Sequence, residues 1–144
     1  MKISFLIMFL IVSSSFAESK GILAKWKTID DETGKPKSIV EIYRDGDVIH
    51  GRILDLINPT EPNPLCDVCK GDKLNKPIKG MEILWGMKET KKGQEWIGGE
   101  ILDPNNGKTY NCKLSLKEDG EKLDVRGFIG ISLLGRTQTW LREK

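Results

Sequence analysis

The chain has 144 residues, a length typical of one domain with a real hydrophobic core. Its 23 lysine and arginine residues nearly balance its 21 aspartate and glutamate residues, which excludes the strong positive charge typical of nucleic-acid-binding domains. We therefore expect no nucleic-acid partner.

The first 17 residues have the pattern of a signal peptide. Lys2 gives a positive start, a mainly apolar run follows at 3–12, and small residues lead to Ala17. We expect cleavage after Ala17, which leaves a mature domain at 18–144 in the periplasm or outside the cell. The apolar run is about half the ~20 residues that a membrane span needs, so we expect no transmembrane span in the mature protein.

The remaining sequence repeats a strand-like run followed by a short polar turn. Apolar and polar residues alternate along each run, and turn residues such as Asp45-Gly46-Asp47 and Glu118-Asp119-Gly120 separate the runs. The predicted strands cover 22–29, 38–44, 48–57, 79–88, 95–102, 108–117, 122–131 and 136–142. This pattern predicts an all-β domain, a single antiparallel up-and-down barrel of about eight strands. A β-sandwich is the alternative, because alternation alone does not separate the two.

Along each strand, every second side chain is expected to face the barrel interior. On the fifth strand the predicted inward residues include Ile97 and Gly99, and on the seventh they include Leu123 and Ile129. The predicted ligand-binding wall of the barrel consists of Met81, Ile83, Trp85, Met87, Tyr110 and Leu114. We interpret the lysine-rich stretches 70–79 and 88–92 as solvated edges.

The segment 58–77 interrupts the strand pattern with four prolines and a Cys-x-x-Cys pair. Connections this long are uncommon unless they form lids or binding loops, so the segment is a candidate to lie across a barrel mouth. A disulfide between Cys66 and Cys69 is the default expectation in an oxidising compartment. Pairing of either cysteine with Cys112, or a metal site using the three cysteines, are the alternatives.

The sequence contains no recognisable catalytic arrangement. His50 is the only histidine, and neither a Ser-His-Asp triad nor a pair of catalytic carboxylates can be read around it. We therefore predict a protein that is not an enzyme and that uses no cofactor and no metal.

Three ordered motifs resemble a known bacterial family. They are CDVCKG at 66–71, ILDPNNGKTY at 101–110 and RGFIGISLLGRTQTW at 126–140, and Trp26 precedes them near the mature start. The chain is similar to the exported bacterial proteins catalogued as domain of unknown function 2147. This resemblance implies a lipocalin-like barrel that binds a small apolar molecule, in a family without a settled enzymatic activity.

Lipocalins close one barrel end by packing an arginine near the last strand over a tryptophan of the first strand, which usually stands in Gly-x-Trp. Here the first strand reads Ala24-Lys25-Trp26, without the glycine, and Arg136 and Arg142 are the available partners. We assign the closure to Trp26 and Arg136. Arg136 shares a strand face with Trp140, so ligand-carboxylate recognition by Arg136 is the alternative.

These observations predict an exported protein that holds a small hydrophobic or amphipathic molecule in its barrel. A cell-envelope protein-interaction module with a packed barrel is the first alternative, and a cavity of roughly 300 Å³ or more distinguishes the two. The second alternative is a metal or redox protein that uses Cys66 and Cys69.

Overall fold

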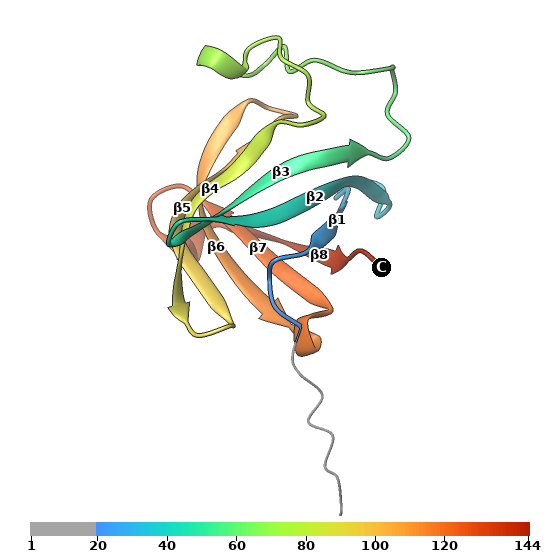
Figure 1. The fold of residues 1–144 in the computed structure, drawn as a ribbon. Coiled ribbons are helices and arrows are strands. Elements are labelled where there is room, and N and C mark those ends of the chain that lie inside the picture. The colour runs from blue at the N-terminus through green and yellow to red at the C-terminus, as the bar shows by residue number, and fades with distance from the viewer. Residues whose placement is uncertain (1–19) are drawn as a thin grey trace, which may run out of the picture.

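The structure is a computed structural model that describes residues 20–144, and within this range it forms a closed barrel of eight antiparallel strands (Figure 1). The strands are β1 (Lys25–Ile29), β2 (Pro36–Asp45), β3 (Val48–Leu56), β4 (Glu82–Lys91), β5 (Glu95–Asp103), β6 (Lys108–Lys117), β7 (Lys122–Phe128) and β8 (Arg136–Arg142). The connections between strands contain three short 3₁₀ helices, η1 (Gly71–Lys73), η2 (Glu118–Gly120) and η3 (Ser132–Leu134). The all-β barrel prediction is confirmed. The predicted signal peptide and its cleavage site lie outside the described residues.

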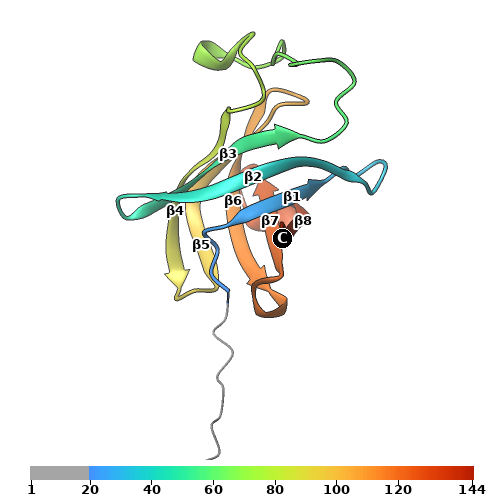
Figure 2. The ribbon, with the colours of Figure 1, turned by 45° about the vertical axis from the view of Figure 1, so that its right-hand side comes forward.

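Each strand pairs with its neighbours in sequence, and β8 pairs with β1 to close the barrel. The closing register places Trp26 opposite Arg142 and Lys27 opposite Leu141. Strands β1, β2 and β3 cross in front of β4, β5 and β6 when the molecule is turned (Figure 2). The continuous hydrogen-bonded ring excludes the sandwich, which needs two separate sheets. Among residues 20–144, no helix is long and apolar enough to cross a membrane.

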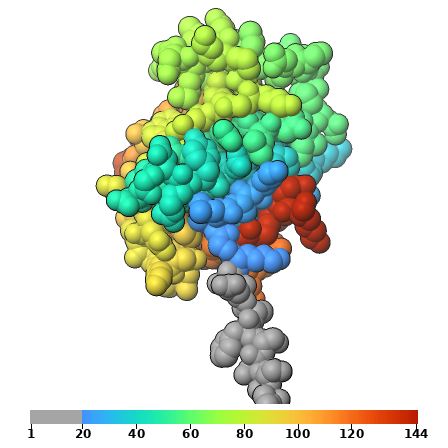
Figure 3. Space-filling model, in the orientation of Figure 1, coloured from blue at the N-terminus to red at the C-terminus, as the bar shows by residue number. Residues whose placement is uncertain are grey.

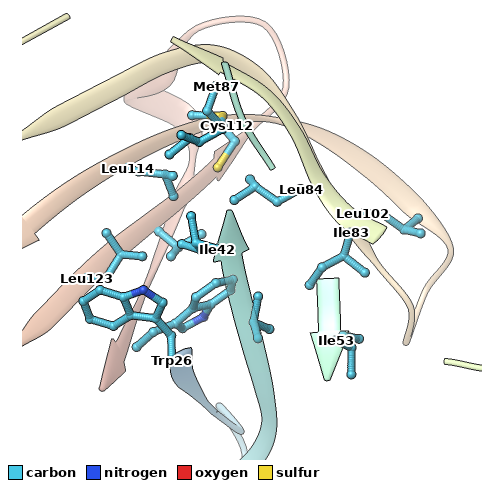
Figure 4. Packing of buried hydrophobic residues seen from close by; sticks show 14 of the residues in the cluster. Trp26, Ile42, Ile53, Ile83, Leu84, Met87, Leu102, Cys112, Leu114 and Leu123 are labelled. Atoms are coloured by element: carbon cyan, nitrogen blue, oxygen red, sulfur yellow. The ribbon is translucent and has the colours of Figure 1, made fainter. Parts of the chain in front are cut away.

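The barrel interior is filled by apolar side chains from all strands. Trp26, Ile42, Leu84, Met87, Cys112, Leu114 and Leu123 point toward one another in the close view (Figure 4). A Cβ added at Gly99 would lie 2.5 Å from Met87 Sδ, so the methionine occupies the volume that a side chain at this position would need. The region between β4 and β5 is therefore closely packed.

Extra residues in β4 and β5 change which side chains face inward. Strand β4 has two bulges relative to β3. The pairs Arg52 with Glu82 and Gly51 with Leu84 leave one extra residue on β4. A second extra residue lies before Met87, next to Gly86 at φ +69°. Each bulge reverses the alternation. Leu84 therefore faces inward and Trp85 faces outward, which corrects the prediction for Trp85, whereas the second bulge returns Met87 to the interior.

The same effect corrects the prediction for Ile97. The pairs Trp96 with Leu114 and Gly99 with Cys112 leave one extra residue on β5, next to Gly98 at φ +84°. Trp96 is consequently buried and Ile97 is exposed. Ile129 was also predicted to face inward and is exposed, because β7 ends at Phe128.

Arg142 closes one end of the barrel over Trp26. The Arg142 guanidinium carbon lies 4.6 Å from the centre of the Trp26 ring. Its Nε donates to the carbonyl of Gly120 at 2.6 Å and its Nη2 donates to the carbonyl of Gly21 at 2.5 Å. Arg142 thus joins the segment before β1 to the β6–β7 turn. The lipocalin-type closure is present, but its arginine is Arg142 and the assignment to Arg136 was wrong.

The opposite end, which we call the loop end, carries the connections 30–35, 57–81, 104–107 and 129–135, because alternate connections of an up-and-down barrel lie at one end. The longest of them, 57–81, extends beyond the ends of β3 and β4 (Figure 1). In the space-filling view it forms a green mass on top of the barrel (Figure 3).

Candidate ligand-binding cavity

The predicted ligand-binding wall does not form one surface. Met87 and Leu114 are completely buried in the core, and Met81 and Ile83 are also buried. These four side chains contribute to packing in this structure. Trp85 lies on the outer face, so the six predicted wall residues are divided between the core, the outer face and the loop end.

Tyr110 and Arg136 lie at the loop end. Tyr110 is half-buried, and its hydroxyl accepts a hydrogen bond of 2.9 Å from Asn106 Nδ2. Arg136 is paired with Gly127 in the register, but its side chain is 69% exposed and forms an ion pair with Asp31 of the connection 30–35. Gln138 Nε2 donates to the same Asp31 carboxylate at 2.7 Å. Arg136 therefore ties the start of β8 to the connection 30–35 at the barrel rim.

The connection 57–81 is a structured loop built around a disulfide. Cys66 and Cys69 are bonded, which confirms the expected pairing, and both side chains are buried. The Cys66 amide donates to the carbonyl of Lys76, and the Asn75 amide donates to the carbonyl of Cys66, each at 2.8 Å. A bridge between Leu65 and Pro77 adds a short antiparallel contact. These bonds hold the two halves of the loop side by side.

This loop rests on the β5–β6 turn. Cys66 Sγ lies 3.6 Å from the carbonyl oxygen of Pro104, a contact without a proton, because a disulfide sulfur has none to donate. A Cβ added at Gly107 would lie 1.8 Å from the Val68 carbonyl oxygen. Gly107 also has φ +71°. The loop can approach this turn so closely only because position 107 has no side chain.

A cavity of about 460 Å³ lies between this loop and the outer face of the barrel. We call it the loop cavity. Its lining comes from the loop, from β4, from β5, from the start of β6 and from the connection 129–135. The lining residues are Cys69, Lys70, Asp72, Lys73, Trp85, Leu102, Gly107, Lys108, Thr109 and Ile129.

The loop cavity combines an apolar wall with a positive rim. Trp85, Leu102 and Ile129 supply the apolar contacts, and three lysines outnumber the single aspartate. Lys73 Nζ lies 5.2 Å from the centre of the Trp85 ring, a cation–π distance. Lys70 and Lys73 were expected to lie at a solvated edge. Nothing local to the sequence shows that the loop packs on β4 and places them beside this cavity.

A smaller cavity of about 370 Å³ lies under the connection 129–135. Its lining residues are Ile97, Gly98, Gly99, Asn111, Cys112, Lys113, Phe128 and Ser132. It offers one lysine, so it lacks the basic rim of the loop cavity.

His50 is part of a polar network on the outer face of β2, β3 and β4. Its Nδ1 lies 2.9 Å from Glu82 Oε1, and the Tyr43 hydroxyl donates to Glu82 Oε2 at 3.3 Å. Burial, together with the Glu82 carboxylate, raises the pKa of Tyr43 above its ordinary value. The Tyr43 and His50 rings are stacked, with 5.8 Å between their centres. These contacts link three neighbouring strands and account for His50 as a structural residue.

The buried thiol of Cys112 gives a pH-dependent prediction. Burial raises its pKa from 9.0 to about 12, so the unfolded thiol ionises at lower pH than the folded one. Its contribution to stability is complete below pH 9 and is lost as the pH rises from 9 toward 12. When the pH is raised from about 8 to about 10.5, we expect the free energy of unfolding to fall less in Cys112→Ala than in the parent protein. Urea titrations at these pH values measure this, and parallel losses in both proteins would contradict it.

The metal alternative receives no geometric support in residues 20–144, where no group of three His, Cys, Asp or Glu side chains is placed to hold a metal ion. The redox alternative is limited to the disulfide, because Cys112 is buried in the barrel.

The comparisons with known proteins agree with this architecture. Protein HP1028 from the human pathogen Helicobacter pylori, described as belonging to the lipocalin family, matches with a TM-score of 0.73 and 20% sequence identity, over 84% of this chain and 82% of that one. At this identity the likeness shows the fold alone. No curated protein matches the chain. The family DUF2147, described as uncharacterized proteins conserved in bacteria, matches residues 24–142. This match covers every strand of the barrel, and the chain therefore belongs to DUF2147.

Proposed function

We propose that this protein is an exported binding protein for a small amphipathic molecule with an anionic group, and that the molecule binds in the loop cavity. The supporting observation is the cavity of about 460 Å³ in which Trp85 and Leu102 face a rim of lysines. This volume exceeds the roughly 300 Å³ of a usable small-molecule site. Export is supported by the signal-peptide pattern of the first 17 residues.

The lining chemistry favours an acyl chain with a carboxylate or a similar anion. Burying about ten methylenes contributes about 8 kcal/mol, and association costs at least about 4 kcal/mol, so apolar contact alone leaves an affinity near 1 mM. A partly exposed ion pair with Lys73 adds up to about 1 kcal/mol. The anionic group therefore improves affinity several-fold and orients the molecule.

This proposal predicts a preference for dodecanoate over dodecanol. We expect delipidated protein to bind dodecanoate about fivefold more tightly, and we expect Lys73→Gln to remove most of this preference because the charge is lost. Trp85→Ala should weaken both ligands, since it removes the apolar wall. Calorimetric titration measures these affinities, and Lys92→Gln, an exposed lysine of the β4–β5 hairpin, is the matched control.

Two results would contradict the proposal. Equal affinity for the acid and the alcohol in the parent would remove the anionic part. Failure of both ligands to bind would favour the protein-interaction module, because the barrel interior is already filled by side chains.

A further inference from the structure

The connection 129–135 exposes an unusual amount of aliphatic surface. Four of its seven residues, which we call the apolar tip, are large aliphatic residues that project from the loop end. They are Ile129, Ile131, Leu133 and Leu134, with exposed fractions of 70%, 61%, 81% and 76%. Single exposed apolar residues are common, but a contiguous group of this kind indicates an interaction site.

The backbone of the apolar tip is held in this exposed arrangement. Arg126 of β7 donates from Nε to the carbonyl of Ser132 at 2.8 Å and from Nη2 to the carbonyl of Leu133 at 3.4 Å. Its Nη1 donates to Thr137 Oγ1 at 2.9 Å. These bonds hold two carbonyls of η3, in which both leucine side chains are exposed. The exposure is therefore a property of an ordered turn.

Basic side chains lie on the Ile129 side of the apolar tip. Ile129 lines the loop cavity together with Lys70, Lys73 and Lys108, against which Asp72 is the single acidic residue. The Arg126 partners named above are neutral oxygen atoms, so these contacts leave its charge uncompensated. We propose that the apolar tip docks this protein on the surface of an anionic lipid bilayer. The leucines enter the headgroup region, and the basic side chains face the lipid phosphates.

The composition of the surface favours a bilayer over a protein partner. Protein interfaces are depleted in lysine, and their energetic centres are enriched in tryptophan, tyrosine and arginine, with few leucines. The apolar tip consists of leucine and isoleucine side chains, and the basic residues that line the loop cavity with Ile129 are all lysines. Lysine suits a bilayer surface because its long apolar stem follows the acyl boundary while its amine stays in water.

The sharpest test places one reporter at the tip. Cys66 and Cys69 are bonded to each other and Cys112 is buried, so Leu133→Cys introduces a single reactive thiol for an environment-sensitive fluorophore. We expect a blue shift and increased emission with vesicles of equal phosphatidylglycerol and phosphatidylcholine. The response should be weak with phosphatidylcholine alone and should fall when salt rises from about 0.1 M to about 0.5 M. Leu23→Cys, also exposed but before β1, is the matched control and should not respond.

A second variant measures the contribution of the aliphatic side chains. Leu133→Ser with Leu134→Ser should lower co-sedimentation of the unlabelled protein with the anionic vesicles at least about tenfold. Leu23→Ser with Leu141→Ser removes the same kind of exposed side chain elsewhere and should leave binding unchanged. Neither tip leucine lines the loop cavity, so an unchanged circular dichroism spectrum and melting temperature serve as the folding check.

Absence of vesicle binding in the parent, or equal binding by the tip variant, would overturn the proposal. If the parent instead forms a dimer that the tip variant converts to a monomer, without vesicle binding, the tip is an interface between copies of this chain and the proposal is also overturned. These outcomes are independent of dodecanoate binding in the loop cavity.

Discussion

Replacing Trp26 with alanine is expected to lower the free energy of unfolding by about 3–5 kcal/mol. The indole is completely buried among core residues, and its Nε1 donates to the carbonyl of Ile22 at 3.0 Å. Removal of the ring leaves a cavity at the closed end of the barrel and an unpaired carbonyl. Urea unfolding followed by circular dichroism measures the loss. A cost below about 1 kcal/mol would mean that the core does not depend on this residue.

The same measurement tests which arginine closes the barrel. We expect Trp26→Ala and Arg142→Ala to be coupled by about 1–2 kcal/mol in a double-mutant cycle, because the Arg142 guanidinium lies over the indole ring. Arg136→Ala is the matched control, since Arg136 pairs with Asp31 at the loop end. Its effect should add to that of Trp26→Ala. Coupling of Trp26 to Arg136 in place of Arg142 would contradict closure of the barrel by Arg142.

Replacing Gly107 with alanine is expected to separate the disulfide loop from the β5–β6 turn and to lower dodecanoate affinity at least about tenfold. The new Cβ would lie 1.8 Å from the Val68 carbonyl oxygen and 2.5 Å from its carbon. Both are backbone atoms, so no side-chain rotation relieves the overlap, and the loop must move. The loop cavity would then lose the close contact that defines one of its walls.

Gly93→Ala is the control for this prediction. Gly93 has a similar positive φ of +67°, but a Cβ there would meet no atom within 4 Å. Both variants therefore carry the backbone cost of about 1 kcal/mol or more for an L-residue at positive φ, and only Gly107→Ala carries the overlap. Hydrogen exchange of the 64–78 segment should accelerate in Gly107→Ala alone. Unchanged exchange together with unchanged dodecanoate affinity would show that the loop does not depend on this contact.

The strand order and the disulfide could be predicted from the sequence because their signals are local. Turn residues and alternation determine where strands such as β2 and β6 begin and end within a few residues, and consecutive short connections favour an antiparallel meander. Cys66 and Cys69 are three positions apart, so their pairing needed no knowledge of distant contacts. The tryptophan of the closure was identified through the resemblance to lipocalins, from its place in the first strand.

The site depends on contacts that only the tertiary structure supplies. Bulges decide which side of the sheet Trp85 and Ile97 face. A bulge is defined by the register with a neighbouring strand. The alternation within one strand carries no information on that register. The choice of Arg142 over Arg136 depends on which end of β8 meets the start of β1. The loop cavity exists because residues 66–73 pack on β4 and on Gly107. Local patterns thus determined the barrel, and packing between segments distant in sequence decided where a ligand has room to bind.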